Sequence, residues 1–201
     1  MLAVWILRAV TAVLFRLRVE GRVPAEGPLL IAANHVSYLD PVTLGVTIAR
    51  HGRRGRFLAT AALFGVPVLG WAMRRTGLIR VEPRAGRAVL DMARAALEAG
   101  EVVVLYPEGH IAAPGQDLPA RTGVGWLARQ TGVPVVPVAQ WGMQRENRRL
   151  GWLRRRHAAV VVGVPLYPSG GDDRAAAAEV LDAVRALLPW ARASAHGHRR
   201  P

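Results

Sequence analysis

The stretch PLLIAANHVSYLDP, residues 28–41, places a histidine and an aspartate directly behind an apolar run. His35 and Asp40 are five residues apart, which separates their side chains by about 140° on a helix and sends them to opposite faces of a strand. They can therefore meet only where the chain folds back between two elements. Asp40 followed by Pro41 is typical of a helix N-cap and a first-turn proline. The stretch predicts a strand, a tight bend and a helix, with imidazole and carboxylate brought together at the bend.

Short β-type runs alternate with helical runs on both sides of this stretch. Strands are expected at residues 15–21, 28–34, 54–60, 77–82, 101–107, 133–142 and 157–166. Helices are expected at residues 41–50, 66–77, 87–100, 121–132 and 172–188. This alternation predicts a single α/β domain with a mostly parallel sheet flanked by helices. Sites in such folds lie at the carboxyl ends of the strands, which is where the His35 bend falls.

Composition narrows the class of partner and excludes several chemistries. The chain has 201 residues, 51% of them hydrophobic, and a formal net charge of +13, which favours nucleic acid, an anionic membrane or phosphorylated substrates as partners. All the counted basic residues are arginines, so no lysine is present to act as a phosphate anchor or Schiff base. The absence of cysteine excludes disulfides, thiolate metal sites and cysteine nucleophiles, and fits a reducing compartment.

The two ends of the chain differ in character from the middle. Residues 1–15 are almost wholly apolar, but about 14 helical residues cover only about 21 Å, short of a bilayer core of about 30 Å. Apolar side chains beside arginines predict an interfacial, membrane-associating helix, and the alternative is a first helix packed on the core. Residues 16–190 are expected to form the folded domain. The polar residues 191–201 are expected to be a disordered tail.

A histidine whose second ring nitrogen is held by a carboxylate is oriented to remove a proton from a hydroxyl group. His35 and Asp40 are therefore candidates for a general base and its orienting acid. The alternative is a satisfied loop histidine beside a simple helix cap. Ser37 is a weaker candidate for a nucleophile because it lacks a G-x-S-x-G setting. A metal site is disfavoured because His51, His110 and His157 show no ligand spacing, and the two tail histidines, His196 and His198, are expected to lie in solvent.

Several further segments resemble the PlsC-type family of glycerolipid acyltransferases, chiefly the 1-acylglycerol-3-phosphate acyltransferases. The first motif of that family, N-H-x-S-x-x-D, is matched by Asn34, His35, Ser37 and Asp40. Its P-E-G motif after a strand is matched by Pro107, Glu108 and Gly109. Its V-P-[IV]-[VI]-P-V motif is matched by residues 133–138, and Arg121 stands where the family carries the lysine of K-T-G. The resemblance runs from about residue 15 to residue 188.

Two segments depart from the family pattern. The second motif, usually G-x-I-x-V-x-R, reads GLIRVEPR here, with Pro83 in the arginine place and Arg84 one residue later. Which arginine binds phosphate is therefore left open. After P-E-G the chain continues HIAAPGQ, without the hydroxyl and arginine that commonly follow. The identity of the acceptor headgroup is left open for the same reason.

The resemblance implies a glycerol-3-phosphate acyltransferase-like fold and a specific reaction. A fatty acyl group would pass from acyl-CoA or acyl-carrier protein to the sn-2 hydroxyl of lysophosphatidic acid in phospholipid biosynthesis. His35 would act as the base and Asp40 would orient it. No cofactor and no metal would be needed. Substrate-binding residues would include Asn34, Ser37, Arg80, Arg84, Glu108, Gly109 and Arg121.

The implied partners are a lysophospholipid acceptor, an acyl thioester donor and an anionic membrane surface, with no nucleic acid. The implied location is the cytoplasmic face of the cell membrane, as a peripheral or monotopic protein. The run at residues 69–73 is a candidate lining for an acyl chain, and the basic run at residues 145–157 is a candidate contact for anionic lipid or for the donor. The remaining alternatives are another lysolipid or glycolipid acceptor, an inactive membrane scaffold, and a basic nucleic-acid-binding module.

Overall fold

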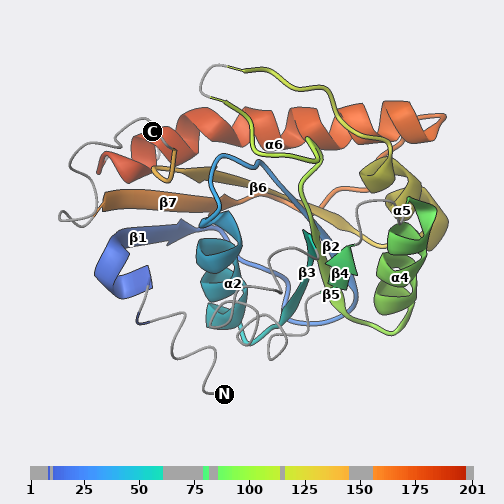
Figure 1. Ribbon diagram of the computed structural model, residues 1–201, viewed down its shortest axis with the longest axis horizontal. Helices are drawn as coiled ribbons and strands as arrows, with labels where there is room; N and C mark the ends of the chain where they lie inside the picture. Colours follow the sequence, from blue (N-terminus) through green and yellow to red (C-terminus); the bar gives the residue numbers. More distant parts are fainter. Residues whose placement is uncertain are drawn as a thin grey trace.

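A single seven-stranded sheet forms the centre of the molecule, as the computed structural model shows in Figure 1. The structure describes residues 9, 11–60, 79–81, 86–113, 116–144 and 156–197, with the backbone alone at residues 59, 60, 80 and 81. In sheet order the strands are β1 (Phe15–Glu20), β7 (Arg156–Val162), β6 (Val135–Trp141), β2 (Leu29–Ala33), β5 (Val102–Leu105), β3 (Gly55–Thr60) and β4 (Ile79–Val81). The five strands from β6 to β4 are mutually parallel, whereas β7 is antiparallel to β6 and carries β1 parallel to itself. The mostly parallel α/β sheet predicted from the sequence is confirmed.

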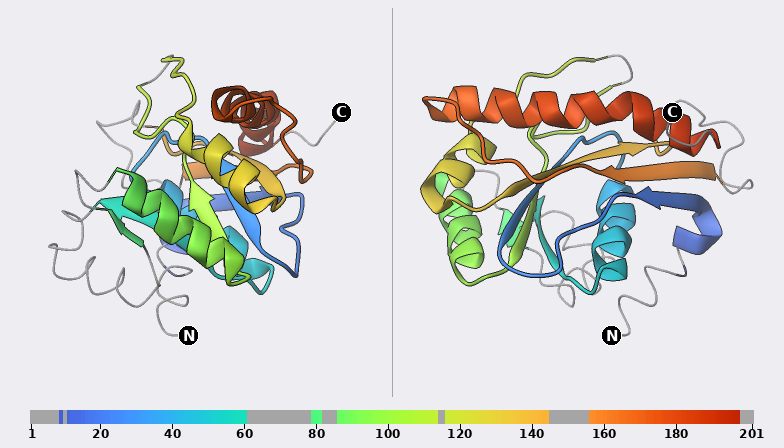
Figure 2. Two further views of the ribbon diagram at one scale, coloured as in Figure 1. Left: turned by 90° about the vertical axis from the view of Figure 1, so that its right-hand side faces the viewer. Right: turned by 180° about the vertical axis from the view of Figure 1, so that it is seen from behind.

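Helices cover both faces of this sheet (Figure 2). Their bounds are α2 (Asp40–Arg50), α4 (Arg87–Glu98), α5 (Gly123–Thr131) and α6 (Asp173–Ala195). The alternating side chains of β2 divide the core in two. Leu30 and Ala32 join a cluster with residues of α4, α5 and α6, whereas Leu29 and Ile31 join a cluster with residues of α2. All five residues of β2 are buried, so β2 is the central strand whose end presents the bend.

Helix α6 is longer than the sequence pattern predicts. It continues through Pro189 to Ala195, so the disordered tail expected from residue 191 is wrong for residues 191–195. The cause is tertiary: the carboxylate of Glu20 on β1 accepts hydrogen bonds from the Trp190 indole, at 2.7 Å, and from the Ser194 hydroxyl. Ser194 is fully buried there. These contacts hold a helix end that polar composition alone marks as frayed.

The structure describes only part of residues 1–15, where the sequence predicts a membrane-associating helix. Phe15 opens β1 and is buried in a small cluster with Met143 and Ala158, so it belongs to the sheet and not to the helix expected over residues 1–15. Residues 1–8 and 10 lie outside the described residues, as does the helix expected at 66–77. Among the helices that the structure describes, none has both the length and the hydrophobicity of a bilayer-spanning segment.

Candidate active site

The two side chains of the opening stretch meet at the carboxyl end of β2. The chain leaves the strand at Ala33, bends, and enters α2 at Asp40. His35 Nδ1 lies 2.9 Å from Asp40 Oδ2. The Asp40 side chain is fully buried, whereas 17% of the His35 side chain is exposed. Because a carboxylate can only accept, Nδ1 carries the hydrogen, which leaves Nε2 as the basic nitrogen.

Asp40 holds the bend as well as the imidazole. Its Oδ2 also accepts the N–H groups of Val36, at 2.6 Å, and Ser37, at 2.8 Å. The N-cap position falls on Leu39, whose side chain makes no capping bond, so the prediction of Asp40 as N-cap is wrong. The carboxylate faces back into the bend, where it accepts the backbone N–H groups of the residues that follow β2. Burial, the largest cause, raises the pKa of Asp40 above its usual value, and its bonds to His35 and to the bend oppose that rise.

Backbone N–H groups at the start of a helix beside the base are the kind of donor that can stabilise an oxyanion. The structure shows that they are already used: the N–H of Asp40 bonds to the Ser37 carbonyl, and the N–H groups of Val42 and Thr43 both bond to the Leu39 carbonyl. Ser37 Oγ accepts the N–H of Leu39 at 3.2 Å. The N–H groups of Asp40, Val42 and Thr43 are therefore not free to bind an oxyanion. Ser37 is 7% exposed and makes a local loop contact.

The loop after β5 encloses His35 from the other side. Since β5 pairs with β2 in parallel, both strands end at the same edge of the sheet. The Tyr106 ring stacks on the imidazole, with centroids 4.1 Å apart and an interplanar angle of 15°. Glu108 Oε2 accepts the His35 N–H at 2.8 Å, and the N–H of Ala112 donates to the His35 carbonyl at 2.9 Å. The backbone and ring of His35 are thus held by this one loop.

Sequence reasoning missed Tyr106. Its position before P-E-G, at the end of the strand expected beside β2, was the signal that could have found it. Burial, followed by the negative charge of Asp40, raises the pKa of Tyr106 well above the usual tyrosine value, so the phenol stays neutral. The Gln140 side chain opposes this rise, although its approach to the buried hydroxyl falls short of a well-formed hydrogen bond.

Asn34 supports the site by pairing with the backbone of β6. Its Nδ2 donates to the Gln140 carbonyl at 3.0 Å, and its Oδ1 accepts the Gln140 N–H at 2.7 Å. The side-chain amide therefore extends the β2–β6 ladder after the last paired residues, Ala33 and Val138. Asn34 is only 3% exposed. Both polar ends of the amide thus pair with β6, and the predicted role of Asn34 in binding substrate stays a prediction.

Gln140 was also missed, and it ties this ladder to α2. Its Oε1 accepts the hydroxyl of Thr43 at 2.9 Å, and both side chains are fully buried. The Asp40 carbonyl lies 3.1 Å from the same hydroxyl oxygen and shares its single hydrogen with Gln140. The buried polar groups beneath the bend thus form one connected network. Such a network fixes the position of Asp40 relative to β6.

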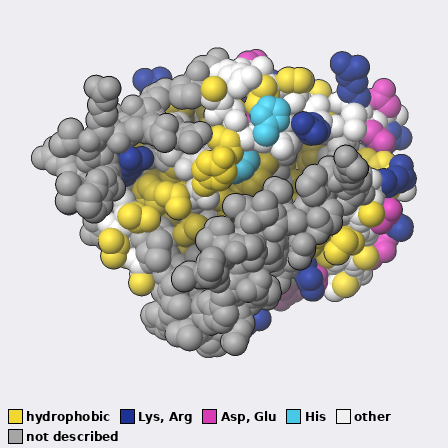
Figure 3. Space-filling model, in the orientation of Figure 1, with side chains coloured by type: hydrophobic (Ala, Val, Ile, Leu, Met, Phe, Trp, Pro, Cys, Tyr) yellow, Lys and Arg dark blue, Asp and Glu magenta, His cyan; other side chains and the backbone are white. Residues whose placement is uncertain are grey.

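Of the predicted phosphate-binding arginines, the structure places Arg121 beside the site. The Arg121 side chain crosses directly over Gly109, where an added Cβ would collide with it. The backbone N–H of Arg121 donates to the Pro107 carbonyl at 2.8 Å. Gly109 has φ +75°, a conformation that favours glycine. Arg84 and the side chain of Arg80 lie outside the described residues. On the face in Figure 3, hydrophobic side chains lie around histidine near its middle, which suits an apolar substrate.

Residues 16–141 match the family model described as Acyltransferase. The chain belongs to the acyltransferase family. It is 30% identical, over 76% of its length, to a chloroplastic 1-acyl-sn-glycerol-3-phosphate acyltransferase, BAT2, from Brassica napus. It is 34% identical, over 67% of its length, to a lyso-ornithine lipid O-acyltransferase from Pseudomonas aeruginosa. The chain covers 45% and 51% of these two relatives, so it spans about half the length of the curated relatives it matches.

The solved structures include one with the same fold. The crystal structure of the 1-acyl-sn-glycerophosphate (LPA) acyltransferase PlsC from Thermotoga maritima matches with a TM-score of 0.75. The match covers 99% of this acyltransferase and 80% of that chain, at 22% identity. At that identity, the likeness bears on the fold.

The stacked ring of Tyr106 is expected to hold the imidazole of this acyltransferase in its working orientation. Tyr106→Leu removes the stack and is expected to lower kcat about tenfold, since an aromatic pair contributes about 0.5–1.5 kcal/mol. Tyr106→Phe keeps the stack and removes a hydroxyl that makes no well-formed hydrogen bond and only approaches the Gln140 side chain, so it is expected to retain kcat and stability close to those of the wild type. The measurement is kcat and KM for all three proteins. Equal kcat for the leucine and phenylalanine variants would exclude a positioning role.

Glu108 is expected to make stability depend on pH. Burial, the largest cause, raises its pKa above the usual 4.5, and the His35 N–H opposes that rise. The folded protein therefore binds a proton more readily than the unfolded chain does just above pH 4.5, and stability falls as the pH rises through the raised pKa. Glu108→Gln keeps an oxygen for the His35 N–H and is expected to reduce this fall. The measurement is Tm against pH, with exposed Glu98→Gln as control; unchanged profiles for both variants would contradict it.

Proposed function

We propose that this acyltransferase transfers a fatty acyl group from an acyl thioester to the sn-2 hydroxyl of lysophosphatidic acid, giving phosphatidic acid. The observation that carries the proposal is the contact of 2.9 Å between His35 Nδ1 and Asp40 Oδ2, with the imidazole partly exposed. The names of the curated relatives support the acceptor. The donor is acyl-CoA or acyl-carrier protein.

The reaction proceeds in one enzyme-bound complex. His35 Nε2 takes the proton of the acceptor hydroxyl as its oxygen attacks the thioester carbonyl, forming the C–O bond. When the tetrahedral intermediate collapses, the C–S bond breaks and the imidazolium returns the proton to the departing thiolate. Asp40 stabilises the imidazolium and fixes the tautomer. Both substrates are present together, so no acyl-enzyme is formed.

The acceptor phosphate binds at Arg121, whose guanidinium fork matches phosphate oxygens in geometry. Arg80 and Arg84 are further candidates. The substrates are lipids, so the enzyme works at an anionic membrane surface, and we place it on the cytoplasmic face of the cell membrane. The net charge of +13 supports this attachment.

A second acceptor is favoured by a specific observation. The lyso-ornithine lipid O-acyltransferase is 34% identical to this chain, and the chain lacks the family's usual continuation after P-E-G. The test is release of free thiol from one acyl-CoA with a panel of acceptors that includes lysophosphatidic acid, lyso-ornithine lipid and a neutral lysolipid. Release with lysophosphatidic acid supports the proposal. Release with lyso-ornithine lipid alone would replace the acceptor, and no release with any member of the panel would overturn acyl transfer to lysolipids.

A further inference from the structure

The loop between β5 and α5 carries both the groups that surround His35 and the arginine proposed to bind the acceptor phosphate. Its base is closed by the bond of 2.8 Å from the Arg121 N–H to the Pro107 carbonyl. This closure brings the Arg121 side chain over Gly109. The loop therefore has a near side, residues 106–113, and a far side, residues 116–121, which return to the same point.

The two sides of the loop are held by different parts of the molecule. On the near side, Glu108 Oε2 accepts the His35 N–H at 2.8 Å, and the Ala112 N–H donates to the His35 carbonyl at 2.9 Å. The far side is instead held from α6, at Asp117 and Leu118. The position of the far side thus depends on a helix that is remote in the sequence.

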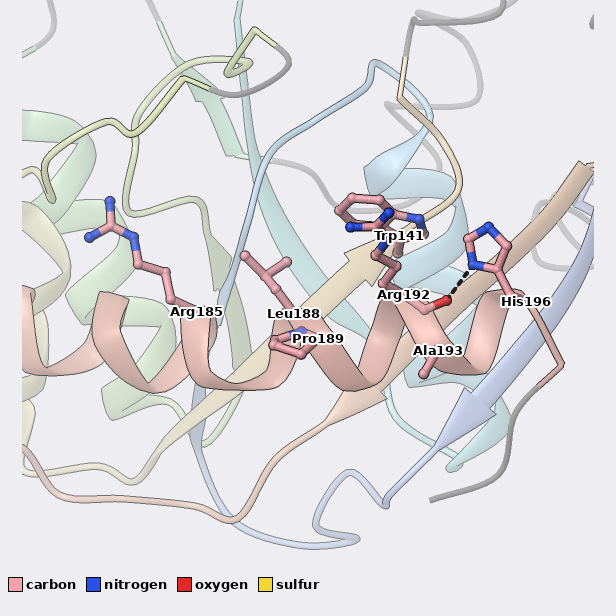
Figure 4. Close-up of a pocket in the computed structure, with 7 residues that line it drawn as sticks. All are labelled: Trp141, Arg185, Leu188, Pro189, Arg192, Ala193 and His196. Carbon is pink, nitrogen blue, oxygen red and sulfur yellow. Dashed lines mark hydrogen bonds between the residues drawn. The ribbon is translucent and has the colours of Figure 1, made fainter. Parts of the chain in front are cut away.

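Arg185 of α6 makes this connection. Its Nη2 donates to the Leu118 carbonyl at 2.8 Å and to the carboxylate of Asp117. The Arg185 side chain is 34% exposed, and Figure 4 shows it extending from α6 apart from Arg192. The preceding residue, Val184, is fully buried in the core. The guanidinium therefore reaches the loop from a firmly packed part of the helix.

The same guanidinium also acts on the near side of the loop. Burial raises the pKa of Glu108, and the positive charge of Arg185 is one of the effects that oppose this rise. Since charges in water and salt act mainly over short distances, the guanidinium is within electrostatic reach of the carboxylate that holds the His35 N–H. Arg185 thus bonds to one side of the loop and acts on the other by its charge.

We propose that Arg185 is a positioning residue for the acceptor: by tying the far side of the loop to α6, it holds Arg121 beside the site. This rests on the proposed function, in which Arg121 binds the acceptor phosphate. Arg121 follows Leu118 by three residues, whereas the bonds to His35 come from the near side. Loss of the tie therefore displaces Arg121 more than His35, and it affects acceptor binding more than the chemical step.

The deciding variant is Arg185→Gln, with Arg174→Gln as the matched control, because Arg174 is an exposed arginine on the same helix. Arg185→Gln is expected to raise the KM for lysophosphatidic acid about tenfold, the usual effect of losing one charge-assisted hydrogen bond. The KM for acyl-CoA and kcat are expected to stay within about twofold. Arg185→Lys keeps a charged donor and is expected to restore most of the acceptor affinity. A purely structural role would instead lower Tm and change all three kinetic constants together, which would overturn the proposal.

Hydrogen exchange of the Arg121 amide, measured by NMR without substrates, reports on the tie directly, since this amide bonds to the Pro107 carbonyl only while the loop is closed. It is expected to exchange about tenfold faster in Arg185→Gln and at the wild-type rate in the control. Unchanged exchange, or faster exchange with an unchanged acceptor KM, would overturn the proposal. If the wild type acylates no lysolipid while the exchange rates differ as expected, the proposed function fails and the tie from Arg185 to the loop stands.

Discussion

His35→Ala is expected to lower kcat for acyl transfer about 10²–10⁴-fold, the usual contribution of a positioned general base. The exposed edge of the imidazole is the part of the network that reaches the reacting hydroxyl, whereas its Nδ1 and its backbone are held by Asp40 and Glu108. Since the side chain contributes little to binding either substrate, the KM values are expected to change much less than kcat. The measurement is thiol release with saturating acyl-CoA and lysophosphatidic acid.

The matched control is His51→Ala. His51 follows the last residue of α2, at the opposite end of the helix from Asp40, and bonds locally to the Thr47 carbonyl at 2.9 Å. It is expected to leave kcat unchanged. Equal rates for wild type and His35→Ala would remove the imidazole from the mechanism, and the acyl transfer would then need another base. Comparable losses in both histidine variants would point to a general effect on folding.

The bend was predictable because its determinants are local. A strand end, a carboxylate five residues beyond the histidine and a proline at the start of the helix leave few conformations that satisfy all three. The structure confirms the juxtaposition of His35 and Asp40 and the parallel strands that lead to it. The same local reasoning failed to predict what Asp40 bonds to, since its carboxylate turns back toward Val36 instead of forward to the helix.

The supports of the site depend on contacts between distant segments, which periodicity does not reveal. Asn34 and Gln140 are 106 residues apart in the sequence, yet the side-chain amide of Asn34 pairs with the backbone N–H and carbonyl of Gln140. The antiparallel placement of β7, and of β1 beside it, likewise depends on packing between remote segments and not on local patterns. Tyr106 stacks on His35 because β5 and β2 are neighbours and end together. In each case the residue type was visible in the sequence, but its partner became clear only from the sheet order.

Two substitutions of Asp40, to asparagine and to alanine, are expected to separate its contribution to kcat from its contribution to stability. Asp40→Asn preserves the shape, and its oxygen in the place of Oδ2 still accepts the N–H groups of Val36, Ser37 and His35 Nδ1, but the negative charge beside the imidazole is lost. The imidazolium that forms when His35 takes the substrate proton then lacks its counter-charge, and kcat is expected to fall about 10²-fold or more. Stability is expected to stay close to wild type, because the buried carboxylate whose pKa is raised by burial is replaced by a neutral group.

Asp40→Ala is expected to lose both properties. It leaves two backbone N–H groups and the imidazole without their shared acceptor, and a buried donor without a partner destabilises by about 1–3 kcal/mol, so the free energy of unfolding is expected to fall by about 2–4 kcal/mol. Denaturant unfolding and kcat, measured on both variants, test the pair. An asparagine variant with wild-type kcat would show that the carboxylate only closes the bend. An alanine variant as stable as wild type would show that the donors of the bend find other partners, so Asp40 would have to be explained by its effect on His35 alone.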